Sequence, residues 1–149
     1  MASIPHFARI SGIAGLFPQL ACAAAVWIGP EEWRWTALAF GWAYAAIIFT
    51  FLGGTWWGMA SASPDEARRA PRWIWIAAIA PSMIALATYL PWVVGGTWPA
   101  PSLFVLGVAI VLSPLVDQRM VTVRPSWWMM LRVPLSLGLG GATLAIALS

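Results

Sequence analysis

The sequence predicts an all-α fold, a polytopic membrane helix bundle of five transmembrane helices with kinks at prolines and glycines. Of the 149 residues, 61% are hydrophobic and only 9% are charged, whereas a soluble domain carries about 25% charged residues. So little polar surface cannot cover a water-soluble globule, so the lipid bilayer must be the solvent. The apolar runs are continuous and of about helix-spanning length, which indicates helices rather than the alternating strands of a membrane β-barrel.

Five apolar runs each approach the length that a membrane crossing needs. At 1.5 Å of rise per residue, about 20 residues span a hydrocarbon core of ~30 Å. The connections are short, so neighbouring helices should run antiparallel. We expect a single domain, residues 1–149, with transmembrane spans at about 10–28, 35–60, 73–94, 102–116 and 127–148.

The ends of the spans carry helix-breaking residues. The first span ends at 29–30, and we interpret it as a retained helix rather than a cleaved signal peptide, because the residues before Cys22 fit a lipoprotein cleavage site poorly. The second span is long enough to tilt, and the third stops at the glycine pair 95–96. The fourth span is the shortest, and Pro99 and Pro101 should make its start abrupt. The fifth opens on two adjacent tryptophans.

The distribution of arginine predicts the orientation of the bundle. The chain has no lysine, and the cytoplasmic loops of membrane proteins carry an excess of positive residues. With the N-terminus inside, seven of the eight arginines fall at the inner ends of the spans. We therefore expect a cytoplasmic N-terminus and a periplasmic C-terminus. The inner arginines are Arg9, Arg68, Arg69, Arg72, Arg119, Arg124 and Arg132, and the outer one is Arg34.

Four of the expected spans contain an internal proline, and the second contains a glycine pair instead. A proline lacks the backbone donor, frees a carbonyl and bends its helix. Membrane helices tolerate such bends as packing geometry, and a cavity or hinge at the level of the kinks is the alternative. The prolines are Pro18, Pro81, Pro114 and Pro134.

The end of the second expected span combines three glycines with two adjacent tryptophans. Gly54 and Gly58 stand four residues apart, a spacing that forms a flat groove for a close backbone approach. With Gly53 they form a candidate packing or partner face. Packing within the monomer, docking of another subunit and the wall of a ligand pocket all remain open. Trp56 and Trp57 should set the depth of the helix at the membrane interface.

Asp117 and Arg132 are the candidate interfacial charge pair. Asp117 closes the fourth expected span, Arg132 lies inside the fifth, and the hairpin between them brings both to the inner interface. Burying either charge alone in lipid would cost several kcal/mol. We therefore expect an ion pair or a headgroup contact that locks the hairpin, with an ion or substrate site as the alternative.

Residues that could carry catalysis or bind a metal are sparse. Cys22 is the only cysteine, which excludes an intrachain disulfide and a cysteine metal cluster. His6 is the only histidine, and one imidazole without neighbouring ligands is a weak metal or haem candidate. No catalytic triad, phosphate loop or metalloprotease motif is present. We expect no enzymatic activity, no catalytic residues and no metal, and the sequence specifies no cofactor.

Motifs distributed over nearly the whole chain resemble the domain-of-unknown-function 3429 family (DUF3429), which includes proteins like the mitochondrial transmembrane protein 69. The most specific is the segment Phe-Leu-Gly-Gly-x-x-Trp-Gly. The resemblance implies a small multi-pass protein of bacterial inner membranes and mitochondria, here the bacterial inner (cytoplasmic) membrane, and it implies no activity. The matching segments are 12–18, 51–58, 81–82, Asp117 and 125–132.

Three functions follow as hypotheses. The first is a non-enzymatic accessory, assembly or scaffold subunit that packs against a larger inner-membrane complex, such as a respiratory or photosynthetic one. The alternative is a binder of a hydrophobic small molecule (porphyrin, haem, quinone or lipid) in a pocket lined by Trp42, Trp56 and Trp57. A small transporter or channel is less favoured, because polar groups inside the spans are few. The expected partners are the bilayer and other membrane subunits or a second copy, and no nucleic acid.

Overall fold

The computed structural model describes residues 3–62 and 70–149, and these residues form helices and connecting turns without a strand. Five helical segments are long and apolar enough to cross a membrane. The predicted all-α bundle of five membrane-crossing segments is therefore confirmed. The helices are α1 (His6–Ala14), α2 (Phe17–Ile28), α3 (Glu31–Ser61), α4 (Arg72–Val93), α5 (Ala100–Leu112), α6 (Pro114–Arg119) and α7 (Trp128–Ala147).

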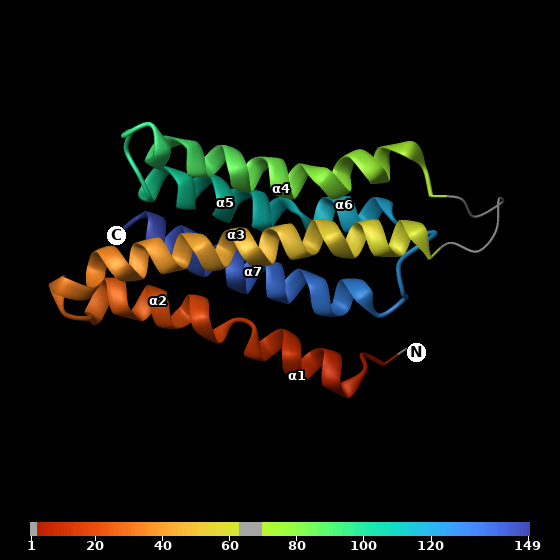
Figure 1. Cartoon of the computed structure of the whole chain (residues 1–149). Helices are drawn as coiled ribbons and strands as arrows, with labels where there is room; N and C mark the ends of the chain where they lie inside the picture. The colour runs from red at the N-terminus through yellow and green to blue at the C-terminus, as the bar shows by residue number, and fades with distance from the viewer. Residues whose placement is uncertain (1–2, 63–69) are drawn as a thin grey trace.

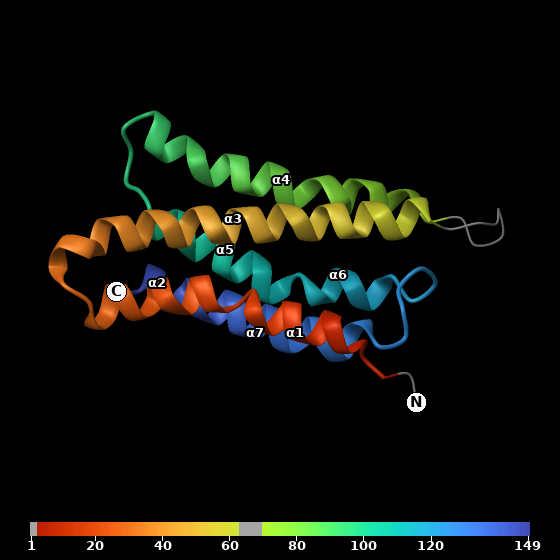
Figure 2. The same ribbon diagram turned by 60° about the horizontal axis from the view of Figure 1, so that its bottom comes forward.

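The long helix α3 forms the spine of an elongated bundle (Figure 1). It contacts α2, α4, α5 and α7, and α5 in turn packs closely along α7. Turning the view shows α1 and α2 lying along α7 (Figure 2). The N-terminus lies at one end of the bundle and the C-terminus at the other, as five crossings require (Figure 1).

The first crossing consists of two helices, α1 and α2, which are separated by a break at Gly15 and Leu16. Pro18 follows this break and has no N–H to donate to the preceding turn. The backbone carbonyl of Gly15 instead accepts a hydrogen bond from the hydroxyl of Tyr44 on α3, at 2.5 Å. A side chain from the neighbouring helix thus satisfies a polar group that lipid could not satisfy. By contrast, α4 continues through Pro81 and α7 through Pro134.

The fourth crossing is longer than the expected span at 102–116, because it runs from Ala100 to Arg119. Pro99 caps the helix and Pro101 lies in its first turn, where a missing N–H leaves no bond unmade. The crossing is divided at Ser113 into α5 and α6. The second crossing also starts earlier than expected, at Glu31, with two acidic residues in its first turn.

Close helix contacts depend on small residues. A Cβ on Gly107 of α5 would lie 2.7 Å from the Leu144 side chain, and one on Gly140 of α7 would lie 3.0 Å from the Gly107 carbonyl oxygen. Ala45 and Ala78 are buried in the same way between α3 and α4. Because lipid is as apolar as the side chains, such packing holds membrane helices together where the hydrophobic effect cannot.

Candidate functional site

The segment from Gly53 to Gly58 presents two different faces of α3. Gly53 and Trp56 face inward: a Cβ on Gly53 would overlap the backbone carbonyl of Ala78 on α4, and Trp56 is only 2% exposed. Gly53 therefore contacts α4, and its lack of a side chain allows α3 and α4 to approach at backbone distance.

Gly54, Trp57 and Gly58 face outward. No described atom lies within 4 Å of a Cβ placed on Gly54 or Gly58, and Trp57 is 47% exposed with its ring 4.8 Å from that of Trp75. Packing of Gly54 and Gly58 within the monomer, one of the readings of their spacing, is therefore wrong. Gly53, one position earlier, makes the intrachain contact instead, and a partner at the outward pair stays a prediction.

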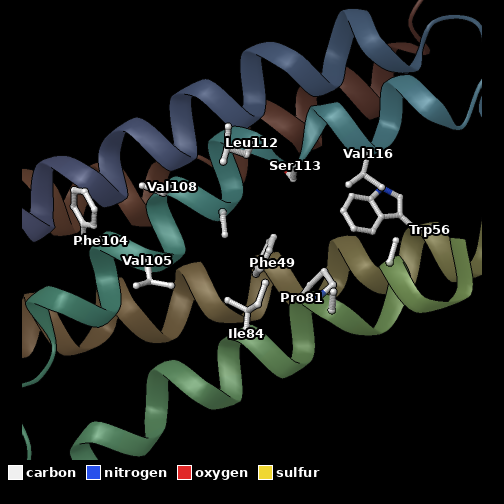
Figure 3. Close-up of a pocket in the computed structure, with 13 residues that line it drawn as sticks. Phe49, Trp56, Pro81, Ile84, Phe104, Val105, Val108, Leu112, Ser113 and Val116 are labelled. Carbon is white, nitrogen blue, oxygen red and sulfur yellow. The ribbon is translucent and has the colours of Figure 1, made fainter. Parts of the chain in front are cut away.

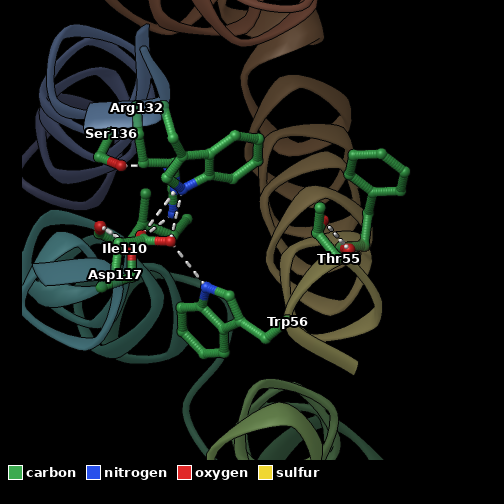
Figure 4. Close-up of polar contacts among 9 residues, drawn as sticks. Thr55, Trp56, Ile110, Asp117, Arg132 and Ser136 are labelled. Carbon is green, nitrogen blue, oxygen red and sulfur yellow. Dashed lines mark hydrogen bonds and ion pairs between the residues drawn. The ribbon is translucent and has the colours of Figure 1, made fainter. Parts of the chain in front are cut away.

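Trp56 does not act as an interfacial anchor, because its indole is buried and donates to a charged group. Its Nε1 donates to Oδ1 of Asp117 on α6 at 2.9 Å. From α7, Nε1 of Trp128 donates to the same oxygen at 2.7 Å. Asp117 is completely buried, so its carboxylate holds indoles from two other helices (Figure 4).

Arg132 completes this buried group. Its Nε lies 3.2 Å from Oδ2 of Asp117, and its side chain is 12% exposed. The guanidinium also donates to the hydroxyls of Ser136 and of Ser113, the latter at 2.7 Å. We call these six residues the polar centre: Trp56, Ser113, Asp117, Trp128, Arg132 and Ser136.

The polar centre joins three of the five crossings at one level of the bundle. Removing one partner from such a buried pair leaves an uncompensated charge and destabilises a protein strongly. Ser113 lies four residues before Asp117 and Ser136 four residues after Arg132, so each shares a helix face with its charge. That spacing could have revealed both serines in the sequence. Nothing local could have revealed Trp56, which lies 61 positions from Asp117.

Trp42 occupies another part of the molecule. Its ring stacks on Tyr89 at 5.5 Å and meets Trp98 edge-on at the same distance, and its Nε1 donates to the Thr88 hydroxyl at 3.2 Å. The structure therefore places Trp42, Trp56 and Trp57 in three separate environments. The tryptophan-lined pocket expected from these three residues does not form.

A first cavity of about 540 Å³ lies between α3, α4 and α5. Its wall is almost wholly apolar, and it is bordered by Pro81 of α4, by Phe49 and Trp56 of α3 and by Ser113 between α5 and α6 (Figure 3). Ser113 donates to the Ile110 carbonyl and accepts from Arg132, and the Trp56 indole N–H is engaged by Asp117. This cavity therefore offers a ligand apolar contact and no free donor from these two side chains.

A second cavity of about 490 Å³ lies on the other side of the polar centre, between α1, α3 and α7. Arg132 and Trp128 form part of its wall, together with Trp127 and Thr55, and Phe49 borders both cavities. Volumes of this size are typical of small-molecule pockets. The polar centre thus presents Trp56 to one cavity and its guanidinium to the other.

Metal ligands do not gather in the part of the chain that the structure describes. Among residues 3–62 and 70–149, no group of three His, Cys, Asp or Glu side chains is placed to hold a metal ion. His6 is exposed at the start of α1, with its ring 6.2 Å from that of Phe7. Cys22 is half-buried in α2 as a free thiol.

The chain is similar to a family of proteins of unknown function. The family described as "Protein of unknown function (DUF3429)" matches residues 4–149, nearly the whole chain. No curated protein matches the sequence. No solved structure matches it either.

Proposed function

We propose that this chain, which belongs to the DUF3429 family of proteins of unknown function, is a non-enzymatic accessory, assembly or scaffold subunit of a larger inner-membrane complex. The observation that carries the proposal is the outward glycine pair of α3, Gly54 and Gly58, which has open space above both Cα atoms among the described residues. The partner we propose for it is a helix of another membrane protein.

The outer face of α3 changes character along its length. Phe40, Ile47 and Phe51 are exposed on it as large apolar side chains, and Gly54 and Gly58 continue the same face one and two turns further on. Large side chains suit contact with lipid tails, whereas a pair of glycines four apart leaves a groove that favours a second helix. The groove lies next to Trp57, whose exposed ring adds a further contact surface.

We propose a cytoplasmic N-terminus for the bundle in a bacterial inner membrane. The end that holds the N-terminus also holds the start of α4 and the end of α6 (Figure 1), which are Arg72 and Arg119. Arg9 lies on α1, and Arg124 follows α6 in the chain. At the opposite end Arg34 donates to the carbonyl of Ser149 at 2.6 Å, close to the acidic first turn of α3. The positive-inside rule supports this orientation. Labelling a Ser149→Cys variant on intact cells tests it, and protection of that position from outside reagents would reverse the topology.

The partner is tested by purification in a mild detergent after crosslinking in the native membrane. We expect the unaltered chain to bring a second subunit with it and the Gly54→Leu/Gly58→Leu variant to lose that subunit while staying folded. Gly141→Leu is the matched control, because Gly141 on α7 is also exposed with no described atom within 4 Å. A monomer without any crosslinked partner would exclude the scaffold function, as would equal loss in the control.

Binding of a hydrophobic small molecule is a second candidate function. The cavity between α1, α3 and α7 favours it, because a charged side chain, Arg132, lies in an otherwise mostly apolar wall. A large apolar pocket with a few converging polar groups is a common form of binding site. This candidate is independent of the glycine pair, so one function can fail without the other.

A further inference from the structure

Arg132 has donor capacity that the polar centre does not use. A guanidinium carries five N–H groups. Nε faces Asp117, Nη1 donates to Ser136 and Nη2 donates to Ser113. Each terminal nitrogen therefore retains one N–H with no acceptor among residues 3–62 and 70–149, on a side chain that borders the cavity between α1, α3 and α7.

The charge of this donor is already balanced. Asp117 is paired with Arg132 and is completely buried, so the polar centre presents hydrogen-bond donors without a net positive charge. A second carboxylate or phosphate would bring an excess negative charge into a low-dielectric site, at a large desolvation penalty. A neutral acceptor such as a carbonyl oxygen avoids that penalty.

Apart from the indole N–H of Trp127, the other polar side chains in the wall of this cavity are engaged within the protein. The hydroxyls of Thr55 and Ser11 already donate to backbone carbonyls of their own helices, at 2.9 Å and 2.7 Å. The Trp128 indole N–H is engaged by Asp117. The directional requirement on a ligand is therefore an acceptor at the end of the cavity that Arg132 and Trp127 share.

The remainder of the wall is aromatic and aliphatic. Trp127 and Trp128 lie at the same end as Arg132, with their rings 6.0 Å apart, and Phe49 and Phe51 line the α3 side. Aromatic walls favour a flat ring, through stacked or edge-on contacts. We infer that this cavity binds a neutral quinone, with one ring carbonyl accepting from Arg132 and the ring held against the aromatic side chains; this inference rests on the second candidate function.

A matched pair of small molecules tests the carbonyl contact. Duroquinone is a tetramethylated benzoquinone, and durene is the same methylated ring without the two oxygens. We expect duroquinone to quench the tryptophan emission of the protein in lipid nanodiscs saturably, since two tryptophans line the cavity. Durene should bind with roughly tenfold lower affinity, measured as its ability to displace duroquinone and restore the emission, because it cannot accept a hydrogen bond from the charged donor.

Two variants locate the site. The pair Arg132→Met with Asp117→Asn removes the donor and leaves no unpaired charge, and it should reduce duroquinone affinity by roughly tenfold. Thr55→Phe fills the cavity without altering the polar centre, so it tests the site even if the first variant does not fold. Ala80→Phe, in the wall of the other cavity, is the control and should leave quenching unchanged.

The possible results distinguish failure of the quinone contact from failure of small-molecule binding in this cavity. If durene and duroquinone compete equally and Thr55→Phe removes both, the cavity binds apolar molecules and the carbonyl contact is wrong. If bilayer lipids extracted with the protein displace duroquinone at stoichiometric amounts, the occupant is lipid and the quinone is excluded. If no saturable quenching occurs, the quinone site and the second candidate function both fail.

Discussion

In α3, the segment from Gly53 to Gly58 has one face packed against other helices and one face exposed, although both faces carry glycine and tryptophan. Inward, Gly53 meets the backbone of α4 and Trp56 donates to Asp117. Outward, Gly54 meets no described atom and Trp57 is half exposed. The segment holds the same two residue types on each face, one position apart. Because successive helical residues are rotated by about 100° around the axis, one glycine can pack against another helix while its neighbour faces outward.

The same contrast recurs on α7. Gly140 faces α5, where a Cβ would lie 2.6 Å from Val111, and Gly141 has no described atom within 4 Å. Glycine pairs therefore do not act as units in this bundle. Each pair supplies one position that allows close helix packing and one that stays available on the outside.

The largest effect on stability should come from removing the Asp117 carboxylate, which accepts the hydrogen bond from Trp56 on the inward face of α3. Asp117→Ala would leave the buried Arg132 without its counter-charge and two indoles without their acceptor. We expect a loss of about 3 to 5 kcal/mol in the free energy of unfolding, measured by denaturation in mixed micelles. Glu32→Ala, an exposed carboxylate at the other end of the bundle, should change it by less than about 0.5 kcal/mol.

The next largest difference in stability should be between substitutions of Gly53 and of Gly54 in α3. Gly53→Ala forces the Ala78 backbone to move and should destabilise the protein by about 3 kcal/mol, since backbone cannot rotate away as a side chain can. Gly54→Ala should be neutral or stabilise slightly, because alanine is the better helix former. Thermal unfolding of both variants in the same detergent measures the difference. Equal midpoints would show that the two faces are not distinct.

The two tryptophans provide the third comparison. Trp56→Phe removes a hydrogen bond to a buried carboxylate and should cost about 2 kcal/mol. Trp57→Phe keeps most of the edge contact with Trp75 and should have little effect on unfolding. The emission spectra supply a separate readout, because loss of Trp56 should remove emission from a buried indole. A similar loss of stability in both variants would contradict the assignment.

The smallest difference in stability should be between substitutions of Gly140 and of Gly141 in α7. A Cβ on Gly140 would lie 2.6 Å from the Val111 side chain and 3.0 Å from the Gly107 carbonyl oxygen, a looser backbone contact than that at Gly53, so we expect Gly140→Ala to cost about 1 kcal/mol. Gly141→Ala should show no loss. Unfolding in mixed micelles measures both, and a larger effect at Gly141 would mean that its outer face is covered in the membrane.

Patterns within single segments predicted a good part of this molecule. Hydropathy and length located the five crossings, because each is set by composition over about 20 residues. Asp117 and Arg132 could be singled out because charges inside apolar spans are rare and need partners. The helical spacing of Ser113 and Ser136 to these charges was also present, although it did not enter the prediction.

The remaining errors share one physical origin. The outward direction of Gly54 and Gly58 and the inward direction of Trp56 depend on how α3 is rotated about its axis. That rotation is set by contacts with the helices packed around α3. Pro99 and Pro101 do mark the start of the fourth crossing, which begins at Ala100 rather than at position 102.

The sequence by itself determined that this protein is a bundle of five apolar crossings, because lipid leaves the backbone few alternatives to a helix. It also determined that a carboxylate and a guanidinium must find partners inside that bundle. Only the tertiary structure decided which partners these are, by bringing Trp56 of α3 to Asp117 across 61 positions of sequence. It likewise decided which glycine of each pair is packed, since a single helix can turn either face toward its neighbours.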